Sequence, residues 1–383
     1  MILFALAAGL SVANVYYAQP LLDALARDFG VAQAAVGGVV TATQLGCALA
    51  LMFLVPLGDR MDRRRLMLSQ LLGLVVALLV VATARATWLL LLGMLGVGLL
   101  GTAMTQGLIA YAARAAAEGE QGRVVGRVQG GVFLGLLLAR VFSGAVSDLA
   151  GWRWVYGGSA VLMLLVALPL WRKLPVVPVT ISLTYGQLVG SMVRLLAEDR
   201  VLRVRGLLAL LMFADFNIFW SALVLPLSAE GFSHTAIGAL GLVGAAGALL
   251  AARAGSWADR GYASRTPGGA LVLLGLAWFP LFWMKGWLLL GILLLDAGGQ
   301  ALHVTNQSLI FRDRGEEHSR LVGLYMLFYS LGSGLGAMAT TLVYARFGWW
   351  GVCVLGEAVS LLALVFWMKE EWGRRRPDQV CQM

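Results

Sequence analysis

The chain has 383 residues, of which 60% are hydrophobic and only 13% are charged, and its formal net charge is +9. A soluble domain carries about twice that share of charge, so the composition excludes an ordinary soluble enzyme and predicts a membrane protein. The positive balance alone would also fit a nucleic-acid-binding surface, and the positions of the charges decide between the two.

Twelve apolar segments are long enough to cross a bilayer, because about 20 helical residues at ~1.5 Å each span the hydrocarbon. The first segment lacks a basic leader and is interpreted as a span, not a cleaved signal peptide. The sequence therefore predicts an all-α integral membrane protein with short external turns between antiparallel helices. The predicted spans are 2–22, 34–57, 66–84, 87–112, 124–147, 153–171, 206–228, 234–254, 268–284, 287–310, 320–344 and 349–368.

Lysine and arginine gather in alternate loops between these spans. The stretches 58–65 and 172–205 are strongly basic, whereas loops on the opposite side hold isolated residues such as Arg85 and Arg153. Because cytoplasmic loops collect Lys and Arg, both termini are predicted to lie in the cytoplasm, with the chain in a bacterial inner (plasma) membrane. The charge reflects topology, and no nucleic-acid partner is expected.

The two halves of the chain repeat. Gln33-Ala-Ala-Val-Gly37 corresponds to His234-Thr-Ala-Ile-Gly238 at an offset of about 200 positions, which indicates a six-helix unit duplicated in parallel orientation. The predicted domains are an N-terminal six-helix bundle, a cytoplasmic linker, a C-terminal six-helix bundle and a cytoplasmic tail. Their bounds are 1–174, 175–205, 206–368 and 369–383.

The linker contains apolar residues spaced to form one face of a helix over 185–197. This pattern predicts either a short helix lying on the membrane surface or a bland polar connection.

Polar side chains in the first, second and fourth spans are candidates for contact with a small-molecule substrate. Polar groups avoid lipid and face the bundle interior or a watery cavity. Each of them is equally compatible with a hydrogen bond that holds two helices together. These candidates are Asn14, Tyr17, Gln19, Gln44 and Gln106.

The fifth span combines small residues with a permanent cation. Gly135, Ser143 and Gly144 allow close helix packing, and Arg140 lies among them. Arg140 is predicted either to snorkel outward or to pair with a buried carboxylate. Gln129 shares its face and is a further candidate for substrate contact.

Ionisable residues of the second half stand in the seventh and tenth spans. Asp215 in the seventh is placed to pair with Arg140 or to carry a proton. In the tenth span, four polar residues at i, i+4, i+7 and i+11 share one face. Ionisable groups inside a membrane cost ~2.5–3.5 kcal/mol on insertion scales and mark substrate paths or proton relays. The four residues are Asp296, Gln300, His303 and Gln307.

Asp296 and His303 are therefore proton-coupling candidates together with Asp215 and Arg140, and the alternative is hydrogen bonding between helices. Tyr325 and Tyr329, one turn apart in the eleventh span, are predicted to form an aromatic wall. The third, sixth, ninth and twelfth spans are expected to face lipid, although Glu357 in the twelfth does not fit that pattern.

Two charged loops carry a resemblance to a known family. Six charges lie within Gly58–Arg65, and a weaker copy follows at Gly255–Gly261. They resemble the loops between helices 2 and 3 and between helices 8 and 9 of the major facilitator superfamily, with the pattern G-x-x-x-D-R-x-G-R-R/K-R/K. Val55 and Asp62 stand at the two glycine positions. The matching residues, which the resemblance implies are gate residues, are Asp59, Arg60, Arg63, Arg64, Asp259 and Arg260.

Further motifs resemble the drug:proton antiporter branch of that family. Gly135–Gly144 is similar to the antiporter motif G-x-x-x-G-P-x-x-G-G, but Arg140 replaces its proline. In the fourth span Gln106 matches the motif R-x-x-Q-G, whereas Ala103 replaces the arginine. Asn14–Pro20 is also similar to the opening of bacterial members.

The resemblance implies a twelve-helix transporter with a central cavity that opens alternately to each side. We expect export of small, partly hydrophobic compounds by proton antiport from a monomer embedded in the lipid bilayer. Neither a nucleotide-binding motif nor a metal-ligand spacing occurs in the sequence, so no cofactor, metal site or enzymatic activity is expected. The alternatives are proton-linked sugar or metabolite export, and a non-transporting membrane sensor or subunit.

Overall fold

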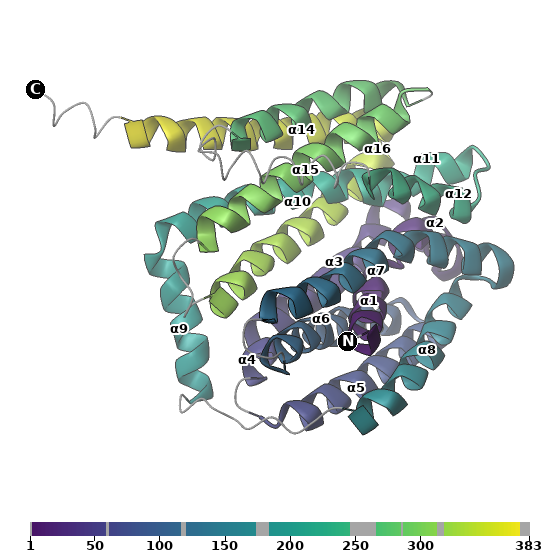
Figure 1. Ribbon diagram of the computed structural model, residues 1–383. Coiled ribbons are helices and arrows are strands. Elements are labelled where there is room, and N and C mark those ends of the chain that lie inside the picture. Colours follow the sequence, from purple (N-terminus) through teal and green to yellow (C-terminus); the bar gives the residue numbers. More distant parts are fainter. Residues whose placement is uncertain are drawn as a thin grey trace, which may run out of the picture. The chain divides into compact units, whose positions relative to one another are not determined.

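The computed structural model describes residues 2–58, 61–115, 120–173, 184–245, 266–284, 286–311 and 318–375. Every regular element within these ranges is a helix (Figure 1). Ten helical segments of the described chain are long and apolar enough to cross a membrane. The all-α membrane fold predicted from the sequence is thus confirmed.

The last of these segments contains two spans. Helix α16 runs from His318 to Arg375, and Gly348 inside it has the non-helical angles φ 61° and ψ −158°. Glycine adopts a positive φ without the steric cost that a side chain would add, so the helix folds back there. The described chain thus accounts for eleven of the twelve predicted spans, and the predicted eighth span begins at α12, with its part after residue 245 outside the described residues.

The first six spans follow the predicted order. Their elements are α1 (Ile2–Tyr16), η1 (Gln19–Leu21), α2 (Leu22–Phe29), α3 (Gln33–Leu49), the π-helical η2 (Ala50–Leu54), α4 (Val55–Leu57), α5 (Arg63–Thr83), α6 (Thr87–Ala115), α7 (Gln121–Ala150) and α8 (Trp152–Lys173).

The first span differs from its prediction because it is interrupted and longer. Pro20 lies in the 3₁₀ turn η1, where its missing N–H is tolerated. The helix then resumes as α2 and ends only at Gly30, a left-handed cap with φ 60°. The additional turns carry Asp23 and Arg27 beyond the predicted end of the span.

The remaining elements follow after residue 184. They are α9 (Tyr185–Glu198), α10 (Arg200–Ala222), α11 (Val224–Ala229), α12 (His234–Ala239), η3 (Leu240–Leu242), α14 (Thr266–Trp283), α15 (Leu288–Phe311) and α16.

The chain divides into two compact units. The first comprises Met1–Val193 together with Leu223–Leu242, and the second comprises Arg194–Ala222 and Val243–Met383. The segment Leu223–Leu242, which by sequence belongs to the second half, therefore packs with the first six spans.

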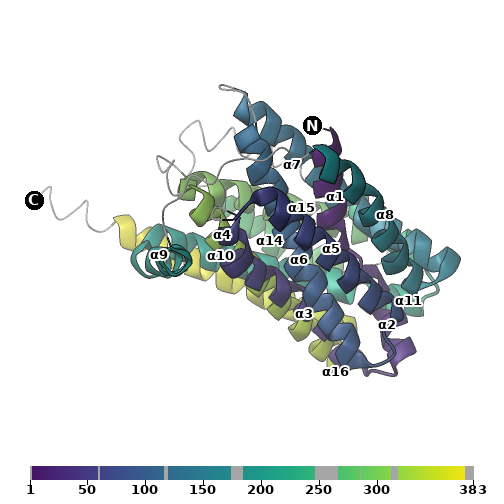
Figure 2. The ribbon, with the colours of Figure 1, turned by 90° about the horizontal axis from the view of Figure 1, so that it is seen from below.

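Small residues hold the central helices of both units in close contact. In the first unit a Cβ on Gly131 or Gly135 of α7 would overlap the backbone of α1, and α3 packs on α6 in the same way (Figure 1, Figure 2). In the second unit Gly332 and Gly336 of α16 lie against the backbone of α10. This G-x-x-x-G packing occurs at the offset of about 200 residues seen in the sequence, so the repeat extends to helix contacts.

The linker helix predicted over 185–197 is confirmed as α9. Thr184 and Gln187 cap its start reciprocally, with the Thr184 N–H donating to Gln187 Oε1 at 2.8 Å and the Gln187 N–H to Thr184 Oγ1 at 3.3 Å. Leu188 and Met192 are buried on one face, as the spacing of its apolar residues indicates.

Exposed apolar side chains follow the helices that were expected to face lipid. Helices α5, α8 and α14 and the second part of α16 each present such a row. Members of these rows are Leu72, Val76, Leu79, Leu164, Leu165, Leu168, Val272, Leu276, Phe279, Leu361, Leu362 and Val365.

Candidate functional site

An aromatic cluster in the second unit joins three helices. The rings of Phe213 (α10) and Tyr329 (α16) have centroids 4.0 Å apart, and Phe213 also meets His303 (α15) at 5.3 Å. The His303 and Tyr325 rings lie 5.4 Å apart, and His303 Nδ1 is 2.9 Å from the Tyr325 hydroxyl. Tyr325 and Tyr329 are therefore brought together with His303, as an aromatic wall requires, and Phe213 is the member that the sequence analysis missed.

The polar stripe of the tenth span forms one helical face on α15. Gln300 and Gln307 are half-buried, whereas Asp296 is buried. The Asp296 carboxylate lies against Gly244, where an added Cβ would come within 2.6 Å of Oδ2. Gly244 thus leaves room for an acid between the eighth and tenth spans.

Asn306, also on α15, is a second polar residue that the sequence analysis missed. It is fully buried, and among the described residues neither its amide nitrogen nor its amide oxygen has a hydrogen-bond partner.

Asp215 lies in a different environment of the same unit. Its Oδ1 accepts a hydrogen bond from Trp278 Nε1 at 3.0 Å, and its Oδ2 accepts one from Ser360 Oγ at 2.8 Å. These partners belong to α14 and α16, so Asp215 ties the seventh span to the ninth and twelfth. Glu357 is half-buried, and its Oε1 would lie 3.6 Å from a Cβ on Gly275 of α14, which locates its side chain beside the ninth span.

Arg140 is buried inside the first unit, with 5% of its surface exposed. Its Nε donates to Gln19 Oε1 at 2.8 Å, and its guanidinium lies 5.9 Å from the centre of the Tyr16 ring. The alternative that Arg140 snorkels outward is therefore wrong. A pair with Asp215 or Asp296 would join the two units and stays a prediction.

Other candidates of the first unit differ in their surroundings. Both polar atoms of the Asn14 amide are used, with Nδ2 donating to Leu10 O at 2.8 Å and Oδ1 accepting from Ser159 at 2.6 Å. Tyr17 packs on Phe142 and Tyr156, with ring centroids at 5.5 and 6.3 Å. These contacts are those of packing residues.

Three further candidate glutamines of the first unit differ in their exposure. Gln44 is buried, and within the described chain its Oε1 accepts no hydrogen bond. Gln106 is half-buried on α6, and Gln129 is exposed on α7.

The charged loops are only partly visible. Asp59, Arg60, Asp259 and Arg260 lie outside the described residues, as does the side chain of Arg63. Arg64 donates to the backbone oxygen of Trp171 at 2.7 Å. Asp62, which stands at a glycine position of the family pattern, caps α5 by accepting from the Arg64 N–H at 2.9 Å.

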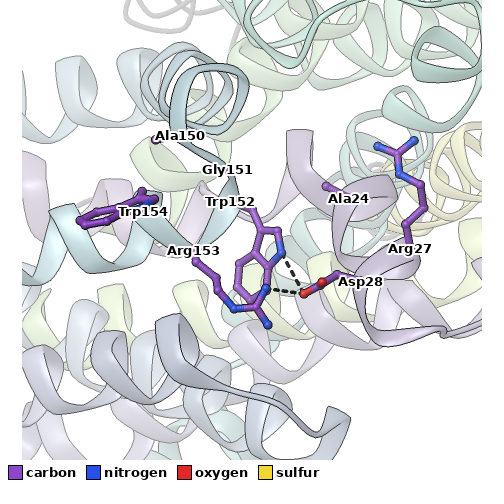
Figure 3. A pocket seen from close by; sticks show the side chains of 8 residues that line it. All are labelled: Ala24, Arg27, Asp28, Ala150, Gly151, Trp152, Arg153 and Trp154. Carbon is purple, nitrogen blue, oxygen red and sulfur yellow. Dashed lines mark hydrogen bonds and ion pairs between the residues drawn. The ribbon is translucent and has the colours of Figure 1, made fainter.

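An open pocket of about 580 Å³ lies at the predicted external end of the first unit, beside α2 and the start of α8 (Figure 3). Asp28 Oδ2 accepts from Arg153 at 2.5 Å and from Trp152 Nε1 at 3.2 Å, and Arg153 also donates to Ala84 O at 3.0 Å. Because Asp28 and Arg153 bind each other, these contacts join spans 1, 3 and 6.

A polar cluster that the sequence analysis missed lies in the first unit as well. His234, the first residue of α12, contacts Asp23 of α2 and Asp148 of α7 through its two ring nitrogens. Both acids directly follow predicted spans, which end at residues 22 and 147. That position beyond the hydrocarbon was the only sequence signal, since acids outside a span are ordinarily solvated.

Comparisons with known proteins agree with the architecture. The family described as Major Facilitator Superfamily matches residues 4–314 and 205–379. The chain is 40% identical over 374 residues to "Uncharacterized transporter YgaY" of Escherichia coli O157:H7, covering 96% of this chain and 95% of that protein. It is 24% identical over 356 residues to a Helicobacter pylori protein named "Probable sugar efflux transporter", covering 91% and 89%.

Solved structures share the fold at low sequence identity. The crystal structure of a bacterial homolog to the human lysosomal transporter Spinster, in an inward-facing and unoccupied conformation, superposes with a TM-score of 0.77. The two sequences are 16% identical, and the match covers 97% of this chain and 96% of that one. At this identity the likeness concerns the fold alone.

Proposed function

This chain belongs to the Major Facilitator Superfamily and is a secondary transporter, not an enzyme; we propose that it exports small, partly hydrophobic compounds in exchange for protons. Substrate contact is assigned to the aromatic cluster Phe213, His303, Tyr325 and Tyr329, together with the glutamines of α15. Proton coupling is assigned to Asp296 on the same helix.

The single observation that carries the proposal is the juxtaposition on α15 of an aromatic cluster and a buried acid. Rings from two other helices, those of Phe213 and Tyr325, pack on His303 with centroids 5.3 and 5.4 Å from it. Aromatic surfaces bind apolar and cationic compounds, and the half-buried Gln300 and Gln307 supply hydrogen bonds that orient them. Such a lining suits cargo that is partly hydrophobic better than highly charged nutrients.

Asp296 is proposed to carry the proton because of its contact with Gly244. A charged carboxylate within a membrane bundle is expensive, and here its oxygen lies against the backbone of the eighth span. Movement of that span would expose the acid to water, where the proton can leave. Loading and release would then be linked to the helix movements of transport.

The test is transport in proteoliposomes under an imposed pH gradient with the Asp296→Asn variant. The proposal predicts loss of gradient-driven accumulation while downhill exchange continues. Asp215→Asn is the matched variant, because an asparagine can still accept from Trp278 and donate to Ser360. Full coupling in Asp296→Asn with loss in Asp215→Asn would move the proton role to Asp215.

Sugar export is the second candidate. It is favoured by the aromatic and amide side chains of the same cluster and by the relative named for sugar efflux. A substrate panel of cationic, neutral and sugar compounds decides between the two, since only one class should compete for efflux. Transport of any of them would exclude a non-transporting sensor.

The orientation and the gates complete the proposal. Both termini are assigned to the cytoplasm of a bacterial inner membrane, which reporter fusions at the two ends would check. The loop residues Asp59, Arg60, Arg63, Arg64, Asp259 and Arg260 are assigned to closing the cytoplasmic side. Asp59→Asn should then lower transport while membrane insertion is unchanged, and full transport by this variant would refute the gating role.

A further inference from the structure

A polar cluster fastens the segment Leu223–Leu242 to the first unit. We name it the outer latch and define it as Asp23, Asp148, Ser228, His234 and Thr235. His234 Nδ1 is 2.9 Å from Asp148 Oδ1, and His234 Nε2 is 3.0 Å from Asp23 Oδ1. One imidazole therefore bridges α2 and α7.

The start of α12 is shaped to fit this bridge. Asp148 accepts the backbone N–H of His234 at 3.1 Å and that of Thr235 at 2.8 Å, so it neutralises the exposed donors of a helix N-terminus. Gly144 and Gly238 bring the two helices into backbone contact, because a Cβ on Gly144 would overlap the oxygen of His234 and one on Gly238 would overlap that of Arg140. The cluster is therefore a built contact and not a chance meeting of surface charges.

The hydrogen bonds of the latch require a proton on the imidazole. Asp23 Oδ2 already accepts from Arg27 at 2.7 Å and from Ser228 Oγ at 2.5 Å, and Asp148 Oδ2 accepts from Thr235 Oγ1 at 2.6 Å. These donors favour the ionised carboxylates, which can only accept. A neutral imidazole donates through one nitrogen and would turn a lone pair toward the other carboxylate. Both contacts are favourable only when both nitrogens carry hydrogen.

The charged groups that face His234 are both carboxylates, and the nearby arginines bind other partners. Asp23 on α2 and Asp148 on α7 face the ring, and Arg27 binds the far oxygen of Asp23. Arg140 of α7 packs against Gly241 and Gln19. The two carboxylates that face the ring therefore both favour the protonated imidazole.

We propose that the outer latch is a proton-binding site that controls whether Leu223–Leu242 stays attached to the first unit. With the proton bound, His234 donates to both carboxylates and the segment is held on α2 and α7. When the proton leaves to water at the predicted external face, one nitrogen loses its hydrogen and the contact on that side becomes repulsive. The start of the eighth span is then free to separate from the fifth.

This inference goes beyond the proposed function, because it concerns neither the substrate nor Asp296. A uniporter could carry the same latch, and a proton antiporter could lack it. The sign follows from the two carboxylate contacts: the latch holds at acid pH, where both ring nitrogens carry hydrogen, and weakens as the pH rises and one of these protons leaves. Its prediction is therefore a conformational transition that needs no substrate.

The experiment measures the distance between spin labels at Leu149 and Phe232 in the full-length protein, reconstituted in lipid, with the native cysteines replaced. Both side chains are exposed and flank the latch, one at the end of α7 and the other just before α12. We expect a short distance at about pH 5.5 and a longer one at about pH 8.5, because histidine changes its charge between these values. A distance that does not change with pH would overturn the proposal.

Asp23→Asn is the decisive variant. The asparagine oxygen can accept from Arg27 and Ser228, and its Nδ2 can donate to a neutral His234, so the latch should stay closed at both pH values. If the carboxylate served only as half of a salt bridge, this variant would instead open at both. An unchanged transition, or opening throughout, would refute the proton site.

Two further variants complete the design. His234→Gln removes the titrating group and should abolish the pH transition. Asp28→Asn is the matched control, since Asp28 lies on the same helix and binds Trp152 and Arg153, away from His234. It should retain the wild-type transition. Loss of the transition in Asp28→Asn would show that the pH response belongs to this end of the unit in general and would overturn the assignment to His234.

Discussion

Two histidines, one in each unit, have opposite surroundings. His234 lies between two carboxylates at the edge of the first unit, with both ring nitrogens facing oxygen atoms. His303 lies inside the second unit, where Phe213 and Tyr325 flank its ring and Nδ1 meets a hydroxyl group. The same side chain thus serves as a charged bridge in one place and as an aromatic packing partner in the other.

The span in which an ionisable residue lies therefore says little about its role. His303 is on the polar stripe where a proton relay was expected, yet no carboxylate of the described chain lies within ion-pair distance of it. His234 is at a helix start, with no polar stripe, and it has two carboxylate partners. Substitutions that alter one environment at a time test whether His234 and His303 have these separate roles.

The largest effect is expected from Tyr325→Ala. Tyr325 is completely buried, and removing a buried aromatic side chain costs about 3–5 kcal/mol, because the transfer energy is lost and a cavity remains. The midpoint of thermal unfolding should fall sharply, while the pH transition of the outer latch stays. Phe279→Ala, at a ring that is 74% exposed on α14, is the control. Equal losses for the two would contradict a packed aromatic cluster.

A smaller but more selective effect is expected from Gly144→Val. The new side chain would meet the backbone oxygen of His234, and overpacking costs about 1–3 kcal/mol. The outer latch should open at acid as well as neutral pH, measured by the distance between the Leu149 and Phe232 labels. Gly130→Val on the same helix is the control, because no other group lies within 4 Å of its added Cβ. A latch still closed in Gly144→Val would mean that α12 adapts to the bulk.

Tyr325→Phe separates the hydroxyl from the ring. It removes the partner of His303 Nδ1 and should cost about 0.5–1.5 kcal/mol, the net value of one hydrogen bond. If the cluster contacts the substrate, substrate affinity should change by no more than about tenfold. The readout is binding or competition in the purified protein. An effect on the pH midpoint of the latch would show that His234 and His303 are coupled and would contradict their separate roles.

The smallest effect is expected from Thr235→Val. The variant loses the Oγ1 donor to Asp148 at 2.6 Å but retains the backbone N–H donor at 2.8 Å. The latch should weaken by about 1 kcal/mol or less, so the open fraction rises at both pH values while the transition between them persists. Complete loss of the transition would mean that the titrating group is Asp148, beside Thr235, and not His234.

The sequence alone determined the fold, because membrane helices are specified by length and hydropathy, and both can be counted. Nine of the predicted spans each correspond to one apolar helix of the described chain, and the eleventh and twelfth, which are continuous in α16, were correctly divided near Gly348. Close packing in the fifth span also followed from the spacing of its small residues, whereas the matching contacts of Gly332 and Gly336 in the second unit were found only in the structure. Since lipid leaves the backbone no alternative to helix, local composition was sufficient for these conclusions.

The partners of polar side chains were decided only by tertiary structure. Helical spacing correctly grouped Asp296, Gln300, His303 and Gln307 on one helix, but it could not show that Phe213 of another helix completes the aromatic cluster. Nor could it show that Asp215 binds Trp278 and Ser360. Periodicity relates residues of one helix, whereas these contacts depend on which faces of different helices meet.

The outer latch was invisible for the same reason. Asp23, Asp148 and His234 stand far apart in the sequence, and each is unremarkable by itself at the end of a span. Their meeting depends on an extension of the first helix beyond Pro20 and on close packing at Gly144 and Gly238. The sequence determined that these side chains would lie near the membrane boundary. Only the packing of three helix ends, which fixes distances to a few tenths of an ångström, decided that they share a proton site.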